Sequence, residues 1–264
     1  MSDFLTRILD HKHTEVARQQ QKVPLAKLQA QLATAPPVRS FANALHRPDR
    51  LALIAEIKRQ SPAKGVLVEQ FDALHFARIY AANGADAISV LTDTRFWGGS
   101  LQYLKTIRAA LPDGPPLLRK DVIIGPYQVW EARAYGADAV LLIAAALDDA
   151  QLHELSSLAH DLGMDALVEV HDAAELRRVL PLQPRLLGIN NRSLHTFVVD
   201  IATTEQLIAQ LPAGVRPVIV SESGIGGELE RLRQWGADAI LVGEAIVTAT
   251  DPGAKVRSLL GQTA

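Results

Sequence analysis

The segment YGADAVLLI, residues 135–143, decides the fold because close copies of it recur along the chain. NGADAISVL begins at Asn83, WGADAILVG begins at Trp235, and a more distant copy, LGMDALVEV, begins at Leu162. The three GADA copies follow the helical patterns FDALHFARIYAA, PYQVWEARAY and GELERLRQW. A glycine directly after a helix suits a left-handed C-terminal position, and the apolar run that follows is typical of a buried parallel strand. The repeat therefore predicts alternating helices and parallel strands.

The spacing of the copies predicts how many such units there are. The distances from Gly84 to Gly136, from Gly136 to Gly163 and from Gly136 to Gly236 are close to two, one and four multiples of a unit. That unit, about 26 residues, has room for one strand, one helix and two short loops. The other predicted strands are LALIAEIK (51–58), PLLRK (116–120), RLLGIN (185–190) and PVIVSES (217–223). Eight units predict a closed (βα)8 barrel, the TIM barrel, over residues 48–264; an open doubly wound sheet would need neither this number nor this even spacing.

Residues 1–47 precede the barrel and predict a helical extension within a single domain. Phe4, Leu5, Ile8 and Leu9 recur at helical spacing, which indicates an amphipathic helix lying on a larger body. We expect a restart at Pro24, a break at residues 36–37 and a short helix over residues 40–46. The extension is interpreted as a cap on the barrel, with a lid that helps to bind substrate as the alternative.

Composition narrows the class of protein. The chain has 264 residues, of which 48% are hydrophobic and 21% charged, and its formal net charge is −2. The sequence has no stripe of Lys or Arg, so nucleic-acid binding is not expected. It also has no apolar run typical of a membrane span or of a signal peptide. The absence of cysteine excludes disulfides, thiolate nucleophiles and Cys-ligated zinc. We expect a cytoplasmic protein, as a monomer or a weak homodimer.

Polar side chains end five of the predicted strands, at the mouth where active sites of (βα)8 barrels lie. Successive side chains of a strand point to opposite faces, so Glu56 and Lys58 share one face. The other polar strand ends are Arg119-Lys120-Asp121, Glu169-Val170-His171, Asn190-Asn191-Arg192 and Ser221-Glu222-Ser223. One such group would be interpreted as a salt bridge at the rim. Five together predict an active site, because buried charges are costly unless function requires them.

The residue types indicate acid–base chemistry and an anion site. A carboxylate among lysines can act as a base, and a lysine near other cations has a lowered pKa and becomes a better acid. The loop of residues 223–227 and the pair Gly243-Glu244 offer glycine-rich backbone after the seventh and eighth strands, which is typical of a phosphate site. No dinucleotide or P-loop fingerprint is present, and the histidine pairs on the predicted helices suit solvated faces. We therefore expect no cofactor and no metal ion.

Five motifs together identify a family that the chain resembles. AEIKRQSPAKG, LLRKD, LVEVH, GINNR and SESGI occur in this order on the barrel frame and cover essentially the whole chain. In this set the chain resembles indole-3-glycerol-phosphate synthase. The resemblance implies a cofactor-free lyase of tryptophan biosynthesis. Such an enzyme converts 1-(2-carboxyphenylamino)-1-deoxyribulose 5-phosphate to indole-3-glycerol phosphate, with release of CO2 and water.

The resemblance also implies roles for the matched residues. Lys120 is similar to the family's general acid and Glu169 to its general base. Glu56 resembles a carboxylate that organises the lysines, while Lys58 is matched to phosphate contact or to the dehydration step. The residues matched to substrate binding are Ser61, Asn190, Arg192, Glu222 and Ser223, and those matched to the phosphate cradle are Gly224, Gly243 and Glu244.

The chain departs from the family pattern beside the general acid. Val122 stands where the family commonly has Phe, which puts the binding of the aryl ring in doubt. We expect Phe96 and Trp97, in the loop RFWGGS, to compensate. Gly125 stands where the family often has Asp, and Ala63 replaces the usual Ser, with less expected consequence.

Two other functions stay open from the residues alone. A lysine that ends a barrel strand can attack a carbonyl, so a Schiff-base aldolase acting on a sugar phosphate is one alternative. A non-catalytic phosphate-binding barrel is the other, and the presence of both Lys120 and Glu169 argues against it. Phosphoribosylanthranilate isomerase shares the expected frame, but that family uses a cysteine as its acid and this chain has none.

Overall fold

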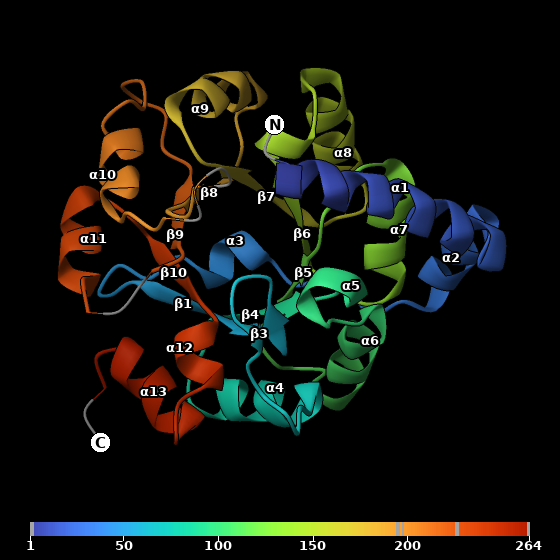
Figure 1. The fold of residues 1–264 in the computed structure, drawn as a ribbon, viewed down its shortest axis with the longest axis horizontal. Helices are drawn as coiled ribbons and strands as arrows, with labels where there is room; N and C mark the ends of the chain where they lie inside the picture. The colour runs from blue at the N-terminus through green and yellow to red at the C-terminus, as the bar shows by residue number, and fades with distance from the viewer. Residues whose placement is uncertain (1–2, 194–195, 197, 225–226, 263–264) are drawn as a thin grey trace.

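A closed barrel of parallel strands forms the centre of the molecule (Figure 1). The computed structural model describes residues 3–193, 196, 198–224 and 227–262. Around the barrel the strands follow the order β1-β10-β9-β8-β7-β6-β5-β4. Their bounds are β1 (Ala52–Ile57), β4 (Ala87–Leu91), β5 (Leu117–Lys120), β6 (Ala139–Ile143), β7 (Asp165–Val170), β8 (Leu186–Asn190), β9 (Val218–Glu222) and β10 (Ala239–Val242). The predicted (βα)8 barrel is confirmed.

Helices alternate with these strands and cover the outside of the barrel (Figure 1). The long ones are α4 (Ala73–Ala82), α6 (Leu101–Ala110), α7 (Pro126–Ala134), α8 (Asp149–Asp161), α9 (Ala173–Val179), α10 (Ala202–Ile208), α11 (Leu229–Trp235) and α13 (Pro252–Leu259). Short helices α5 (Thr94–Trp97) and α12 (Glu244–Val247), the 3-10 turns η1 (Leu32–Thr34), η2 (Ala144–Ala146) and η3 (Leu180–Leu182), and the hairpin β2 (Gln60–Ser61) and β3 (Gly65–Val66) complete the connections. Gly84, Gly136 and Gly236 have φ values of 88°, 89° and 98°, so the glycines of the repeat end their helices as predicted.

Strand alternation divides the apolar core into two layers. Outward-facing residues such as Leu53, Leu117 and Leu187 pack with the surrounding helices. Inward-facing residues such as Ile54 and Leu118 fill the barrel itself. Because alternate side chains point to the same face, the inward set continues into the charged strand ends at the mouth. The core thus holds these charged groups at one end of the barrel.

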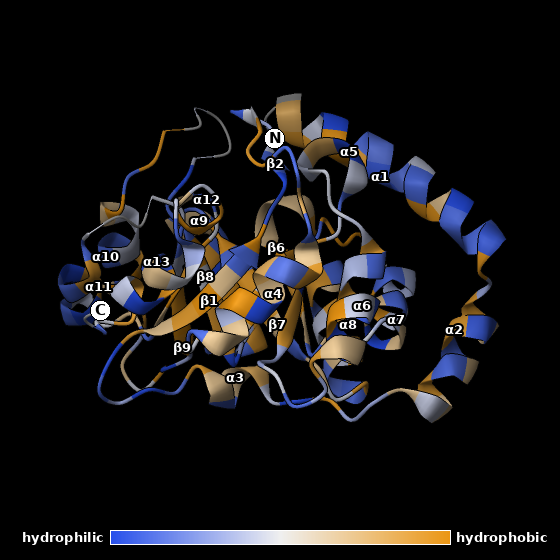
Figure 2. Ribbon diagram, turned by 90° about the horizontal axis from the view of Figure 1, so that it is seen from below, coloured by the Kyte–Doolittle hydropathy of each residue, from blue (hydrophilic) through white to orange (hydrophobic). Residues whose placement is uncertain are grey.

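The N-terminal extension contacts both ends of the barrel. It consists of α1 (Asp3–Lys22), α2 (Leu25–Gln31) and α3 (Phe41–Ala44), and α2 begins directly after Pro24 as predicted. Figure 2 shows α1 lying beside α5 at one end of the barrel and α3 at the other. Phe41 and Leu45 are fully buried against the inward-facing core, so α3 closes the bottom. No helix among the described residues is long and apolar enough to cross a membrane.

The aspartates of the GADA repeat fasten the bottom of the barrel. Asp86 accepts a hydrogen bond from the backbone N–H of Leu53 at 2.8 Å, and Asp138 and Asp238 accept the equivalent bonds from Leu117 and Ile219 at 2.8 Å. Each aspartate directly precedes one barrel strand and its donor lies in the adjacent barrel strand, so each aspartate joins two neighbouring strands of the barrel. Arginines surround these carboxylates: Arg47 and Arg50 at Asp86, Arg39 and Arg108 at Asp138, and Arg216 at Asp238.

Candidate active site

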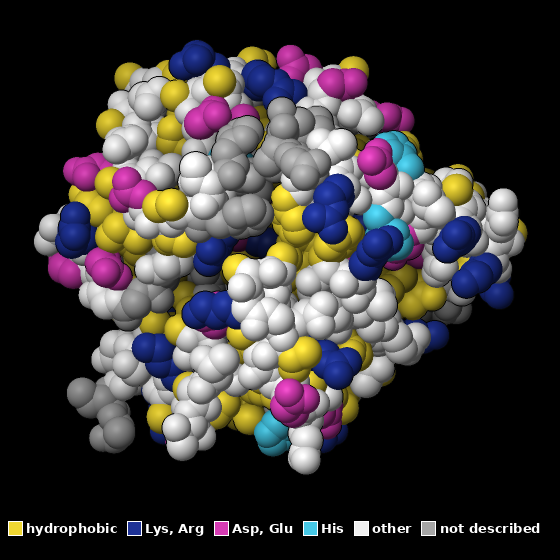
Figure 3. All heavy atoms as spheres, in the orientation of Figure 1, with side chains coloured by type: hydrophobic (Ala, Val, Ile, Leu, Met, Phe, Trp, Pro, Cys, Tyr) yellow, Lys and Arg dark blue, Asp and Glu magenta, His cyan; other side chains and the backbone are white. Residues whose placement is uncertain are grey.

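A cavity of about 430 Å³ opens at the carboxyl ends of the strands. Figure 3 looks onto this end and shows a hollow near its centre, bordered by basic and apolar side chains. The catalytic, substrate-binding and phosphate-binding residues that the family resemblance implied all line the cavity: Glu56, Lys58, Ser61, Lys120, Glu169, Asn190, Arg192, Glu222, Ser223, Gly224, Gly243 and Glu244. The structure therefore brings together side chains from β1, β5, β7, β8 and β9 and the loops that follow them.

Lys120 lies at the centre of the charged cluster. Its Nζ is 3.5 Å from Glu169 Oε2 and donates a short hydrogen bond to Glu222 Oε2. Glu169 and Glu222 come from β7 and β9 and face one another across β8, where Gly188 has no side chain to separate them. All three side chains are largely enclosed. One cation is thus shared by two carboxylates in a space with little access to water.

The pKa values in this cluster differ from the sequence-based expectation. Burial alone would lower the pKa of Lys120, but Glu222, Glu169 and Glu56 raise it. The expectation of a lowered lysine pKa was wrong, because the lysine's near neighbours are carboxylates and not cations. Burial and the adjacent charge of Glu169 instead raise the pKa of Glu222 to about 8. Against burial, which would raise it, Lys120 holds the pKa of Glu169 well below its usual range.

His171 continues the cluster outward from Glu169. Its Nε2 is 3.2 Å from Glu169 Oε1, and its Nδ1 is 3.0 Å from Glu175 Oε2 on α9. Burial would lower the pKa of His171, but Glu169 and Glu175 raise it to about 10. The imidazolium therefore helps to keep Glu169 ionised. The motif LVEVH includes His171, but nothing in the motif indicates its partner Glu175.

Glu56 and Lys58, which the sequence placed on one face, form an ion pair. Lys58 Nζ is 2.8 Å from Glu56 Oε1, and Glu56 is the more deeply buried partner. Gly243 packs against Glu56 so closely that a Cβ at this position would clash with the carboxylate. The pair thus lies close both to Lys120 and to Gly243, the residue after β10.

The glycine end of the cavity includes an unusual backbone conformation. Ser223 has φ 67° and Gly224 has φ 73°, and a left-handed serine costs energy that proteins keep mainly at functional sites. Residues 225–226 of the predicted glycine loop lie outside the described residues. Lys64 of the SPAKG loop forms an ion pair with Glu244, the first residue of α12. This pair bridges the loop after β1 and the loop after β10.

The opposite wall of the cavity is apolar. Its residues come from α1, α5, β6 and the segment after β5: Phe4, Leu5, Ile8, Trp97, Val122, Leu141 and Ile143. Trp97 therefore lies where a replacement for the missing phenylalanine would be needed. Phe96 does not line this cavity and packs edge-to-face on Phe4 and His11 at 5.9 and 5.8 Å between ring centroids. Of the two aromatic residues expected to contact the ring, Trp97 lines the cavity and Phe96 does not.

The remaining predicted binding residues lie between the two ends. Asn190, at the end of β8, accepts a hydrogen bond from the backbone N–H of Arg192 at 3.0 Å. Ser61 lies in β2 and accepts a hydrogen bond from the backbone N–H of Lys64 at 3.2 Å. Among the described residues, no group of three or more His, Asp or Glu side chains could hold a metal ion.

The fold and the site define a (βα)8-barrel enzyme with an acid–base cluster at its mouth. Among solved structures, a 3-hexulose-6-phosphate synthase superposes with a TM-score of 0.61 at 19% identity, over 81% of this chain and 100% of that one; this likeness shows the fold alone. A family model described as indole-3-glycerol phosphate synthase matches residues 5–259.

Curated relatives agree with that family model. An indole-3-glycerol phosphate synthase from Roseiflexus sp. (strain RS-1) is 57% identical over 99% of both chains. One from Acidithiobacillus ferrooxidans (strain ATCC 53993 / BNL-5-31) is 47% identical over 98% of this chain and 99% of that protein. The chain belongs to the indole-3-glycerol phosphate synthase family.

Proposed function

We propose that this chain closes the indole ring of indole-3-glycerol phosphate, starting from 1-(2-carboxyphenylamino)-1-deoxyribulose 5-phosphate and releasing CO2 and water. The observation that carries this proposal is the placement of Lys120, Glu169 and Glu222 between an apolar wall and a glycine-lined end of one cavity. The substrate has the same order of groups. Its aryl ring, its reacting carbons and its phosphate lie in sequence along one molecule.

The substrate fits the cavity in one direction. The phosphate binds at Gly224, Gly243 and Lys58, where glycine backbone and a lysine can meet an anion. The ring lies on the opposite wall against Trp97. Arg192 offers a planar guanidinium to the ring carboxylate, since two parallel N–H groups match its two oxygens. Ser61 and Asn190 bind neighbouring polar groups, and this direction leaves the ketone next to Lys120.

Ring closure needs an acid first. The ring carbon that bears the carboxylate attacks the ketone carbon, and Lys120 donates a proton to the oxygen that becomes a hydroxyl. Loss of CO2 then returns the bonding electrons to the ring. The hydroxyl leaves as water with a proton from an acid, while Glu169 takes a proton from the sugar carbon beside the nitrogen. General acid–base assistance of this kind contributes about 10²- to 10⁴-fold in rate.

Glu222 acts as a proton store in this scheme: it is the protonated group that returns a proton to Lys120 after each donation. Its pKa of about 8 keeps it protonated at neutral pH, and its direct hydrogen bond to Lys120 gives the lysine a nearby source of replacement protons. Glu56 orients Lys58 through their ion pair. His171 holds Glu169 in its ionised form, ready to accept a proton.

A direct assay tests this function. The full chain is incubated with the carboxyphenylamino-deoxyribulose phosphate, and indole fluorescence is followed. We expect continuous formation of product without added metal or cofactor. No product at high enzyme concentration would refute the proposal. Borohydride added with a keto-sugar phosphate tests the aldolase alternative, because a Schiff base would leave a covalent label on Lys120 and our assignment predicts none.

The organisation of the chain is part of the proposal. Residues 1–47 act as an extension that caps the barrel of residues 48–264, and the enzyme works in the cytoplasm as a monomer or weak homodimer. Light scattering across a concentration series tests the oligomeric state. If the measured molar mass is that of a trimer or a larger oligomer and does not fall on dilution, the proposed oligomeric state is wrong.

A further inference from the structure

Lys12 is a fully buried lysine that the proposed mechanism does not use. It lies on α1 and is only 1% exposed. Its Nζ is 2.7 Å from Asp93 Oδ2, 2.9 Å from Asp121 Oδ1 and 2.8 Å from Glu15 Oε2. Burying a charged group costs several kcal/mol unless it is paired. A cation held by carboxylates from three parts of the chain therefore fixes those parts relative to one another.

The first of these partners controls the loop after β4. Asp93 is completely buried and caps α5 by accepting a hydrogen bond from the backbone N–H of Phe96 at 2.6 Å. The same helix contains Trp97, which lines the apolar wall. Lys12 thus binds the carboxylate that sets where the short helix begins, and with it the position of the tryptophan.

The second partner is adjacent in sequence to the general acid. Asp121 follows Lys120 and accepts hydrogen bonds from Thr92 at 2.6 Å and Arg119 at 3.0 Å. Burial would raise the pKa of Asp121, but Lys12 and Arg119 lower it to about 2. The aspartate is therefore a permanent anion, and Lys12 fixes it from the side of α1.

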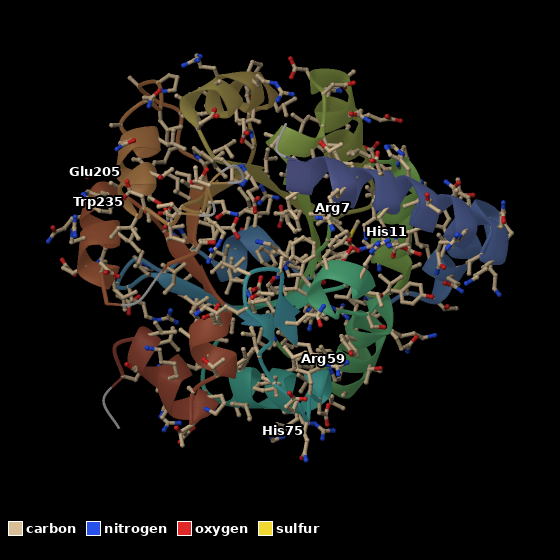
Figure 4. All side chains as sticks on the ribbon, viewed as in Figure 1. Arg7, His11, Arg59, His75, Glu205 and Trp235 are labelled. Carbon is tan, nitrogen blue, oxygen red and sulfur yellow. The ribbon has the colours of Figure 1, made fainter. Side chains whose placement is uncertain are left out.

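The helix that carries Lys12 meets the mouth through apolar and charged contacts, and Phe4 and His11 pack against Phe96. Leu5, Ile8 and Lys12 are buried on α1, at helical spacing along one stripe. Leu5 and Ile8 line the cavity. His11, labelled in Figure 4, accepts a hydrogen bond at Nδ1 from Arg95 of α5 at 3.0 Å, but both side chains are at the surface. The Lys12 ion cluster thus adds a buried charged contact between α1 and the segments beside the apolar wall.

We propose that Lys12 is a positioning residue for substrate binding, holding α1, the Asp93 loop and the segment after Lys120 as one wall around the aryl ring. This inference rests on the proposed function. Val122 gives the ring less contact than a phenylalanine would, so the wall formed by α1 and Trp97 carries more of the binding in this chain. Lys12 itself touches neither the substrate nor the reacting atoms.

The test compares Lys12→Met with Lys22→Met, which removes an exposed lysine from the same helix. A third variant, Asp93→Asn, keeps a side chain able to cap α5 but weakens the ion pair. We expect Lys12→Met to raise KM for the arylamino sugar phosphate at least about tenfold, the effect of losing one well-packed apolar contact to the ring. Asp93→Asn shifts KM in the same direction by less, and Lys22→Met leaves it unchanged.

Two further readouts separate positioning from general damage. Inhibition by inorganic phosphate, which needs only the glycine end of the cavity, stays unchanged in Lys12→Met. Hydrogen exchange without substrate speeds up in α1 and α5 but not in the barrel strands. A lower kcat with unchanged KM, or weaker phosphate inhibition in step with KM, would overturn the inference. If the wild-type chain shows no turnover, the proposed function fails, whereas the exchange comparison still reports on Lys12.

Discussion

The two ends of the barrel both contain buried charges, but the carboxylates at each end have different surroundings. At the bottom, Asp138 is surrounded by donors: the backbone N–H of Leu117, Arg108, and both the backbone and the side chain of Arg39. At the mouth, Glu169 and Glu222 both contact Lys120, and His171 is a second cation beside Glu169. Among the described residues, Glu222 Oε1 is a buried atom without a hydrogen-bond partner.

The difference teaches which charges hold the fold and which do chemistry. A carboxylate held by several donors is fixed in place by them, so it fixes geometry. Two buried carboxylates that lie close together compete for a proton, and their pKa values move apart. Such a cluster can release and accept protons near neutral pH. Each end can be tested by changing one charge and asking whether rate or stability responds.

The largest effect is expected from Lys120→Met. Removing the proposed general acid should lower kcat by about 10²- to 10⁴-fold. The cost in stability should be small by comparison, because Glu169 and Glu222 can take up protons when the lysine is lost. Steady-state rates and urea unfolding on the same sample measure both effects. Lys105→Met, at an exposed position on α6, is the control and should change neither.

Asp138→Asn should give the reverse pattern. The shape of the side chain is kept, but two arginines lose their counter-charge in a buried site, which costs about 3–5 kcal/mol of unfolding free energy. Because Asp138 lies at the far end of the barrel from the mouth, kcat per folded molecule should stay at the wild-type value. Urea unfolding and rates normalised to folded protein test this. A drop in kcat with little loss of stability would contradict the view that the charges at the bottom stabilise the fold and those at the mouth act in catalysis.

Glu222→Gln tests whether the carboxyl of Glu222 titrates as proposed, through the pH dependence of the unfolding free energy. The pKa of Glu222 is about 8 in the folded protein against an ordinary 4.5, so the folded state holds the proton more tightly. Its contribution to stability is complete below about pH 4.5 and is lost as pH rises to about 8. The difference in unfolding free energy between the two proteins should therefore move in favour of the variant across this window. His171 is common to both and cancels.

The same variant should change the pH dependence of the rate. In the wild type, kcat should fall above about pH 8 as Glu222 loses its proton. A glutamine cannot titrate, so this limb should be absent from the profile of the variant. An unchanged alkaline limb would assign the titration to another group and leave Glu222 without its proposed role as proton store.

Much of the fold could be predicted because its signals are local. The glycine of each repeat requires a left-handed backbone after a helix, and φ values of 88° at Gly84 and 89° at Gly136 confirm this. The structural role of the aspartate in the same repeat could not be predicted from the sequence. Its arginine partners, such as Arg39 and Arg108 at Asp138, lie in other parts of the chain, and a single sequence does not pair them.

The sequence predicted which residues meet at the mouth of the barrel, but not how their charges affect one another. Strand alternation and the barrel rule placed Glu56, Lys120 and Glu169 at one mouth, and all three line the cavity. Which charges become neighbours depends on three-dimensional packing, so the direction of the lysine pKa was wrong. Lys12 was equally hidden, because its partners Asp93 and Asp121 are distant in sequence.

The smallest effect is expected from Asp238→Asn. This variant tests whether burial of the ion pair decides how much each repeat aspartate stabilises the bottom of the barrel. Asp238 occupies the same place in the repeat as Asp138 and accepts the equivalent backbone hydrogen bond. Its side chain is 27% exposed, however, and its partner Arg216 is 60% exposed. Water can replace the lost charge there, so the cost should stay below about 1 kcal/mol. Urea unfolding of Asp238→Asn beside Asp138→Asn measures the contrast. Equal losses would show that the shared backbone bond, and not the burial of the ion pair, sets the strength of these fastenings.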